Sequence, residues 1–294
     1  MNSAPEKIDH HRRRFVGTAA LAVASAQLGM SASADAAPRA PKHVLSQSAD
    51  KPDPAKVRAS VVLVHGAWAD GSGWDRVIAP LQAKGLKAMA APIPLTSLSD
   101  DTAALTWALE RTDGPVVLVA HAYSGAVVGA CRNERVQALV FITSLTPDEG
   151  ETVAEVFYRE KSQAPHLTPD KHNLLWIPDD QFHAAWCQNA SPKEAALLAA
   201  TQRPIAVACI QEKAPAPLWK SKPSWYLVAE DDRMINPATQ LFLARRMGAQ
   251  IQSKKVDHAV PITAPDLVVG IILQAVGSIA EPPNREKSDT RQPG

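Results

Sequence analysis

The chain has 294 residues, of which 46% are hydrophobic and 21% are charged, and its formal net charge is +1. This composition suits one globular domain, or one domain with a sizeable insertion, that buries a large core. The balanced charge gives no electrostatic case for nucleic acid or an anionic membrane surface as a partner. No apolar stretch is long and clean enough to span a membrane in the mature protein.

The N-terminus has the composition of an export signal. The basic run His11–Val16 (H-R-R-R-F-V) precedes a small-residue apolar stretch and Ala-x-Ala sites, and it resembles a twin-arginine (Tat) signal. The alternative is a basic, alanine-rich disordered leader. We therefore expect residues 1–36 to be a Tat-type export signal cleaved after Ala34 or Ala36, and residues 37–57 to be a flexible lead-in. The mature protein is then periplasmic or secreted.

Export makes a disulfide chemically possible for the three cysteines. Cys131 lies on the apolar side of an expected helix, and we interpret it as a packed thiol. Cys187 and Cys209 lie in one segment, where the spacing permits a bridge but does not establish one. The sequence contains no C-x-x-C pair, no H-E-x-x-H motif and no dinucleotide or phosphate fingerprint, so it implies neither a zinc site nor a cofactor.

Buried strands and helices alternate along the first part of the remaining chain. Their hydrophobic periods and turn residues predict, in chain order, a strand at 60–64, a helix from Ser72 to about Lys84, a strand at 86–91, a helix from Ser99, a strand–helix pair at 115–132 and a strand at 136–142. Asp100 and Asp101 fall in the first turn of the second helix, where the helix dipole favours negative charge. This rhythm predicts a parallel sheet with helices on both faces.

The strand–helix pair contains the most informative stretch of the chain. Val116–Val119 is a short apolar, β-branched run, and the pattern changes to helical spacing directly after residues 120–124 (A-H-A-Y-S). A buried strand that turns abruptly into a helix through small residues is typical of a nucleophile elbow, which normally reads G-x-S-x-G. Ala122 therefore occupies the place of the attacking serine.

The alternation breaks between residues 146 and 218 and then resumes. The interrupting segment is rich in aromatic residues, and we interpret it as a cap inserted over the carboxyl edge of the sheet; a second layer of core is the alternative. Beyond it the pattern predicts a strand at 225–229, a helix at 237–247, a strand at 250–256, a closing helix at 264–280 and a disordered tail at 281–294.

Three loops leave the carboxyl ends of expected strands, the edge where open α/β sheets place their sites. The first is the elbow, the second contains Asp231 and Asp232, and the third contains His258. The chain order of elbow, acid and histidine is that of a Ser-Asp-His triad on an α/β-hydrolase.

With these motifs the chain resembles α/β-hydrolases of the small esterase group that includes plant methylesterases and hydroxynitrile lyases. It resembles most their bacterial relatives, whose signature begins V-L-V-H-G-A-W. The likeness spans residues 58–280, and its marks are V-H-G-A-W at 64–68, A-H-A-Y-S-G at 120–125, A-E-D-D-R at 229–233 and D-H-A at 257–259. The resemblance implies an α/β-hydrolase fold with a helical cap and a carboxylic ester hydrolase that acts on small or medium esters.

The resemblance also assigns roles to individual residues. His258 would be the general base, and Asp232 would orient it, with Asp231 as the alternative acid. The backbone N–H groups of Ala67 and Tyr123 would form the oxyanion hole. His65 and His121 are expected to brace loops rather than catalyse.

Aromatic residues are expected around the pocket. Trp68, Tyr123 and Trp176 would line an acyl or alcohol site, although plain core packing is an equally good interpretation of each. A small-molecule ester is therefore the expected partner, and the apolar residues of the cap also leave room for a homodimer contact.

The sequence departs from the family pattern at the nucleophile. A methyl group cannot attack a carbonyl, and loss of a triad serine lowers turnover by a factor on the order of a million. Ser124 is not expected to replace it, because it should start the helix and face away from His258. Three explanations remain: a Ser→Ala exchange in an otherwise active esterase, a nucleophile-free protein that binds an ester-like ligand, or lyase or cofactor-free oxygenase chemistry in which His258 is the base.

Overall fold

The computed structural model describes residues 59–280 of the chain. The predicted export signal, the flexible lead-in and the C-terminal tail lie outside the described residues. Within residues 59–280, no helix combines the length and the apolar character needed to cross a membrane.

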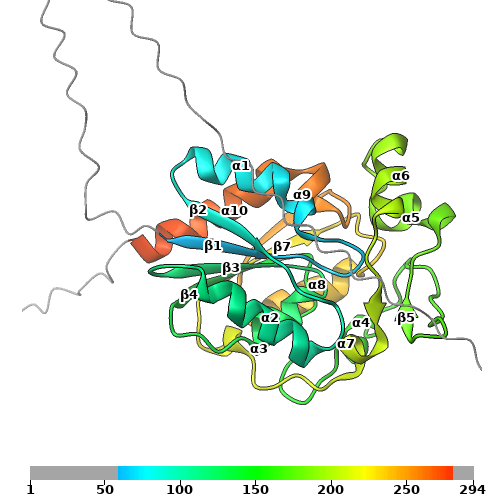
Figure 1. Cartoon of the computed structure of the whole chain (residues 1–294), viewed down its shortest axis with the longest axis horizontal. Coiled ribbons are helices and arrows are strands. Elements are labelled where there is room, and N and C mark those ends of the chain that lie inside the picture. The colour runs from blue at the N-terminus through cyan, green and yellow to red at the C-terminus, as the bar shows by residue number, and fades with distance from the viewer. Residues whose placement is uncertain (1–58, 281–294) are drawn as a thin grey trace, which may run out of the picture. The chain divides into compact units, whose positions relative to one another are not determined.

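A six-stranded parallel sheet forms the centre of the fold (Figure 1). Its strands in spatial order are β2 (Lys87–Ala91), β1 (Ser60–Val64), β3 (Val116–His121), β4 (Val136–Ile142), β7 (Ser224–Ala229) and β8 (Gln250–Lys254). Every residue of β1, β3 and β7 is buried, as expected for strands covered on both faces. The expected α/β-hydrolase architecture is therefore confirmed.

Helices cover both faces of this sheet and enclose two hydrophobic layers (Figure 1). One face carries α1 (Asp75–Ala83), α9 (Val260–Thr263) and α10 (Pro265–Ala280), and the other carries α2 (Leu98–Glu110), α3 (Ser124–Ala130) and α8 (Pro237–Arg246). The strands end together at one edge, so the loops that follow β3, β7 and β8 meet there.

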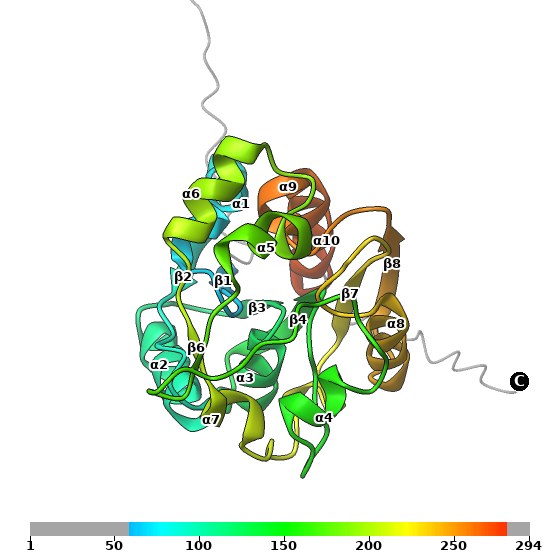
Figure 2. The ribbon, with the colours of Figure 1, turned by 90° about the vertical axis from the view of Figure 1, so that its right-hand side faces the viewer.

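Most of the segment between β4 and β7 lies at that edge (Figures 1 and 2). It contains α4 (Val153–Phe157), β5 (Leu174–Leu175), α5 (Asp179–Trp186), α6 (Pro192–Ala200), β6 (Ile205–Ala206), α7 (Val207–Gln211) and the 3₁₀ turn η2 (Leu218–Lys220). β5 and β6 pair antiparallel, and Ala206 N–H donates to Leu95 C=O, which joins this pair to the loop after β2.

Several element ends differ from the sequence expectation. The first helix begins with a 3₁₀ turn, η1 (Gly71–Trp74), capped by Asp70 rather than Ser72, because Asp70 Oδ1 accepts the Ser72 N–H at 2.8 Å. The second helix is capped by Ser97, two residues before the expected Ser99, because the Ser97 hydroxyl accepts the Asp100 N–H at 3.0 Å.

The cysteine pairing that the sequence left open is not formed. All three cysteines are buried and free. Cys187 follows α5, whereas Cys209 in α7 lies against Asp101 of α2, with 3.7 Å between Sγ and Oδ2. Burial raises the pKa of each of these two thiols to about 12, so both are packed thiols in the same sense as Cys131.

Candidate active site

The chain turns at Ala122 with a strained backbone. Ala122 has φ +51°, in the left-handed region that costs an L-residue about 1–2 kcal/mol, while Tyr123 has already returned to helical angles. The Ala122 N–H donates to Ile142 C=O at 3.2 Å, and the Ala122 C=O accepts the Leu145 N–H at 2.9 Å. These bonds to the end of β4 and the segment after it hold residue 122 in the pose that places an elbow side chain above the sheet.

The space around the elbow is too small for any residue larger than glycine at positions 66 and 125. A Cβ added to Gly125 would lie 2.4 Å from the Leu145 carbonyl oxygen, and one added to Gly66 would lie 2.9 Å from the Ala122 Cβ. The Ser124 hydroxyl is fully buried and donates to Val64 C=O at 2.7 Å. Ser124 therefore braces the elbow against β1 and, as expected, does not take the place of a nucleophile.

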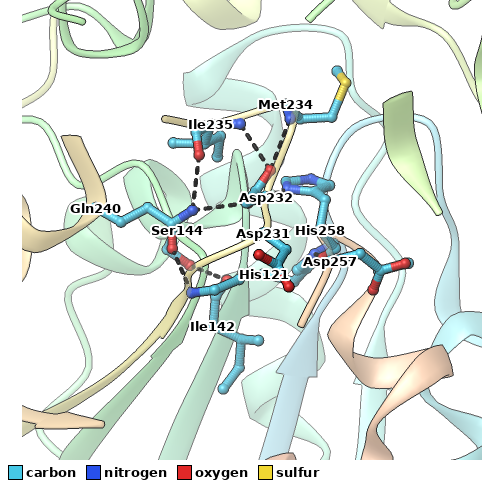
Figure 3. Close-up of polar contacts among 12 residues, drawn as sticks. His121, Ile142, Ser144, Asp231, Asp232, Met234, Ile235, Gln240, Asp257 and His258 are labelled. Carbon is cyan, nitrogen blue, oxygen red and sulfur yellow. Dashed lines mark hydrogen bonds and ion pairs between the residues drawn. The ribbon is translucent and has the colours of Figure 1, made fainter. Parts of the chain in front are cut away.

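Asp232 and His258 form a buried pair at the ends of β7 and β8 (Figure 3). Asp232 Oδ2 lies 2.8 Å from His258 Nδ1, and the two side chains are 0% and 2% exposed. The same carboxylate accepts the N–H groups of Met234 and Ile235 at 2.8 and 2.9 Å and the side-chain amide of Gln240 at 2.8 Å. Three donors thus fix both oxygens of Asp232 and, through them, the imidazole ring.

Asp231, the other acid that the sequence left open, is directed elsewhere. It is exposed, and its described hydrogen bonds are backbone bonds: its N–H donates to Val256 C=O and its C=O accepts the Gln188 side chain at 2.7 Å. Of the two acids, Asp232 alone is paired with His258 among the described residues.

His121 and His65 are buried and line one small pocket together. His121 Nε2 lies 2.9 Å from the His258 carbonyl oxygen, so Nε2 carries the proton and donates it. Burial lowers the pKa of His121 to about 3 and that of His65 to about 4, so both rings are neutral. Both side chains therefore hold loops, and neither lines the cavity beside Ala122.

Two backbone N–H groups, one in the elbow and one in the loop beside it, are free to donate to a ligand oxygen. The hydrogen bonds of residues 59–280 give neither the Ala67 nor the Tyr123 amide an acceptor. The neighbouring Trp68 is fixed instead: its N–H donates to Arg203 C=O at 3.0 Å and its indole N–H donates to Leu175 C=O at 3.0 Å. Trp68 has φ +60°, and both of its acceptors belong to the cap, so the cap holds the loop that carries Ala67.

A cavity opens beside the elbow and contains about 720 Å³ of empty space, including its mouth. Ala122, His258, Ala67 and Tyr123 all line it, and the rest of its wall is apolar: Trp68, Leu145, Val153, Ala154, Phe157, Tyr158, Ala164, Pro165, Leu167, Leu175, Ile205, Ile210, Met234 and Ile235. No hydrogen bond from a described residue reaches His258 Nε2, which leaves this nitrogen open to the cavity.

Trp176 does not line the cavity, in contrast to the expectation. Leu175, the last residue of β5, lines the cavity, whereas Trp176 follows the end of the strand and is not among the lining residues. Trp176 is 44% exposed, and its indole N–H donates to Asp170 at 3.2 Å. Trp186 of α5 instead packs its ring edge against His258, with 6.0 Å between the centroids, and covers the histidine from the cap side.

Sequence reasoning missed a buried carboxylate behind the elbow. Asp101 is 0% exposed and accepts the Tyr123 hydroxyl at 2.7 Å and the Leu95 N–H at 2.6 Å. Burial raises the pKa of this carboxyl group, and it also raises the pKa of the Tyr123 hydroxyl. An Asp in the first turn of a helix is usually exposed, so no sequence signal marked it.

Comparison with known proteins extends these observations. The profile of the Alpha/beta hydrolase family matches residues 61–271. An alpha/beta hydrolase, nvfD, from Aspergillus novofumigatus is 22% identical over 248 residues, which cover 76% of this chain and 99% of that protein.

Solved structures of esterases and hydrolases share the fold. A pyrethroid hydrolase from Sphingobium faniae has a TM-score of 0.62 and 18% identity, covering 76% of this chain and 100% of that one. Polyneuridine aldehyde esterase has a TM-score of 0.61 and 17% identity with the same coverage, and a methylesterase from Arabidopsis has 0.62 and 16%, covering 75% and 99%. Because the family profile spans well over half of the sequence, the chain belongs to the alpha/beta hydrolase family.

Proposed function

We propose that the cavity is the site of a serine-type carboxylic ester hydrolase in which Ala122 occupies the nucleophile position. In this form the chain binds a small or medium ester and does not hydrolyse it through an acyl-enzyme. One observation carries the proposal: His258, which is paired with the buried Asp232, lines the same cavity as Ala122, the elbow residue at positive φ.

Each group has a task in this proposal. Asp232 accepts a hydrogen bond from His258 Nδ1–H in this arrangement, so that Nε2 is the nitrogen that faces the substrate as the base. The amides of Ala67 and Tyr123 would donate to the substrate carbonyl oxygen as it gains negative charge. A serine at residue 122 would lose its proton to His258 as its oxygen attacks the carbonyl carbon, and the leaving alcohol would then take up that proton.

Reversion of the nucleophile tests the proposal. Ala122→Ser should hydrolyse p-nitrophenyl butyrate, with kcat exceeding that of the present chain by a factor on the order of a million. The matched control is Ala122→Ser combined with His258→Ala, which has the serine but no base and should lose this gain. An Ala122→Ser protein that folds and releases nitrophenol no faster than buffer would remove the esterase proposal.

A second candidate function follows from His258 Nε2, which has no hydrogen-bond partner among the described residues and lines the same cavity as the methyl group of Ala122. The oriented base and the free amides are also what proton abstraction from a substrate requires, without any acyl-enzyme. In that case the present chain, with Ala122, would already exchange the α-protons of a bound ester for deuterium in D₂O. His258→Ala would abolish the exchange, and absence of exchange in the present chain would exclude this function.

A further inference from the structure

The polar side chains in the wall of the cavity are already occupied by other parts of the protein. The Trp68 indole N–H donates to Leu175 C=O at 3.0 Å, and the Tyr123 hydroxyl donates to Asp101 at 2.7 Å. The Tyr158 side chain also lines the cavity, but this residue is 72% exposed and so lies at the mouth. Among the lining side chains of residues 59–280, only His258 therefore presents to the interior of the cavity a polar atom, Nε2, that has no hydrogen-bond partner.

No Asp, Glu, Lys or Arg of residues 59–280 lines this cavity. Asp101 lies behind Tyr123, which lines the cavity, and its carboxylate is bound by three donors: the Tyr123 hydroxyl, the Leu95 amide and the Cys209 thiol at 3.7 Å. Its role is therefore to turn the Tyr123 hydroxyl out of the cavity, so that the ring presents only carbon to a ligand.

We infer that the site selects neutral esters whose acyl and alcohol parts are both apolar and whose only polar group is the ester itself. This inference rests on the proposed function and specifies its substrate class. A charged or hydroxylated arm would lose its hydration in the cavity and find no partner there, because the remaining donors and the base converge on the carbonyl group.

The Ala122 chain itself provides the test, because it holds an ester without forming an acyl-enzyme. Calorimetric titration would compare phenyl hexanoate with two esters of similar length, phenyl 6-aminohexanoate and monophenyl adipate. We expect the cationic and anionic esters to bind more weakly than phenyl hexanoate, each by a factor on the order of 100. Equal affinity of all three esters would overturn the substrate class.

Two aromatic residues serve as a matched pair for locating the ester. Phe157 lines the cavity and Trp176 does not, so Phe157→Ala should weaken phenyl hexanoate by about tenfold or more, while Trp176→Ala should leave the affinity unchanged. The reverse result would place the ester outside the cavity and overturn the inference.

The substrate class and the proposed function fail in different experiments. If phenyl hexanoate does not bind at all, the inferred class is wrong. Turnover of p-nitrophenyl butyrate by Ala122→Ser, measured separately, then decides whether an esterase site exists. If that variant is active while the charged esters bind as well as the neutral one, the esterase proposal stands and only its inferred selectivity falls.

Discussion

On the base side of the cavity Asp232 accepts four hydrogen bonds and holds His258 at 2.8 Å, whereas on the elbow side the residue at the turn ends in a methyl group. Yet the elbow keeps its full geometry, with Ala122 at φ +51° and Ser124 bonded to β1. The strained turn therefore depends on packing and backbone bonds and not on a nucleophile. The two sides can therefore be altered separately.

The largest effect is expected on the base side. In an Ala122→Ser background, Asp232→Ala should lower kcat for p-nitrophenyl butyrate by about 10⁴-fold, because His258 loses the partner that fixes its tautomer and orientation. The neighbouring Asp231→Ala is the matched control, since Asp231 is exposed and its described bonds are backbone bonds. Steady-state kinetics of both variants decide the matter, and equal losses would show that the acid has been assigned to the wrong residue.

On the elbow side the expected effect is on stability. Gly125→Ala places a Cβ 2.4 Å from the Leu145 carbonyl oxygen, against backbone that cannot move without disturbing β4. We expect a loss of about 3 kcal/mol in the free energy of unfolding, measured by urea denaturation.

The same helix supplies the control for that substitution. Gly129 also lies in α3, but its added Cβ would meet Pro217 at an ordinary 3.6 Å. Gly129→Ala should therefore stabilise the protein by about 0.5–1 kcal/mol through helix propensity. If both variants lost stability equally, helix α3 and not the elbow contact would be the cause.

The elements of both sides could be predicted from the sequence because their signals are local. Buried β-branched runs marked the central strands, and the small residues around Ala122 marked the elbow. The choice between Asp231 and Asp232 stayed open, because both follow the same strand and their order in the sequence does not show which side chain is buried. The carboxylate of Asp232 is held by Gln240 of α8 and by His258, and neither contact can be read from the local sequence.

Several contacts around the site that sequence reasoning missed are long-range. Asp101 bonds Tyr123 across 22 residues and Cys209 across 108, and His121 bonds the His258 carbonyl across 137. Trp176 was expected at the cavity because it is a large aromatic residue in the cap. It follows a strand of only two residues, which is too short for any periodic pattern to show which way the next side chain points.

His121 joins the two sides, because it ends the elbow strand and donates to the His258 carbonyl. Its folded-state pKa is lowered from 6.5 to about 3 by burial, so below pH 6.5 the unfolded chain binds a proton that the folded chain does not. Stability due to this ring is thus intact above pH 6.5 and is lost as the pH falls toward 3, by about 1.4 kcal/mol per pH unit. The raised carboxyl pKa values of Asp101 and Asp257 act in the opposite direction.

Substitution of His121 measures how much this residue contributes to the loss of folding stability at low pH. His121→Gln keeps an N–H donor for the His258 carbonyl but cannot titrate, so from pH 7 to pH 5 it should lose about 2 kcal/mol less stability than the unsubstituted chain. Asp101 and Asp257 are present in both proteins and cancel in this difference. Urea denaturation at the two pH values measures it, with the exposed His172→Gln expected to follow the unsubstituted chain. Parallel pH profiles for His121→Gln and the unsubstituted chain would mean that the His121 ring accepts a proton in the folded protein as readily as in the unfolded chain, which would contradict the lowered pKa of this buried ring.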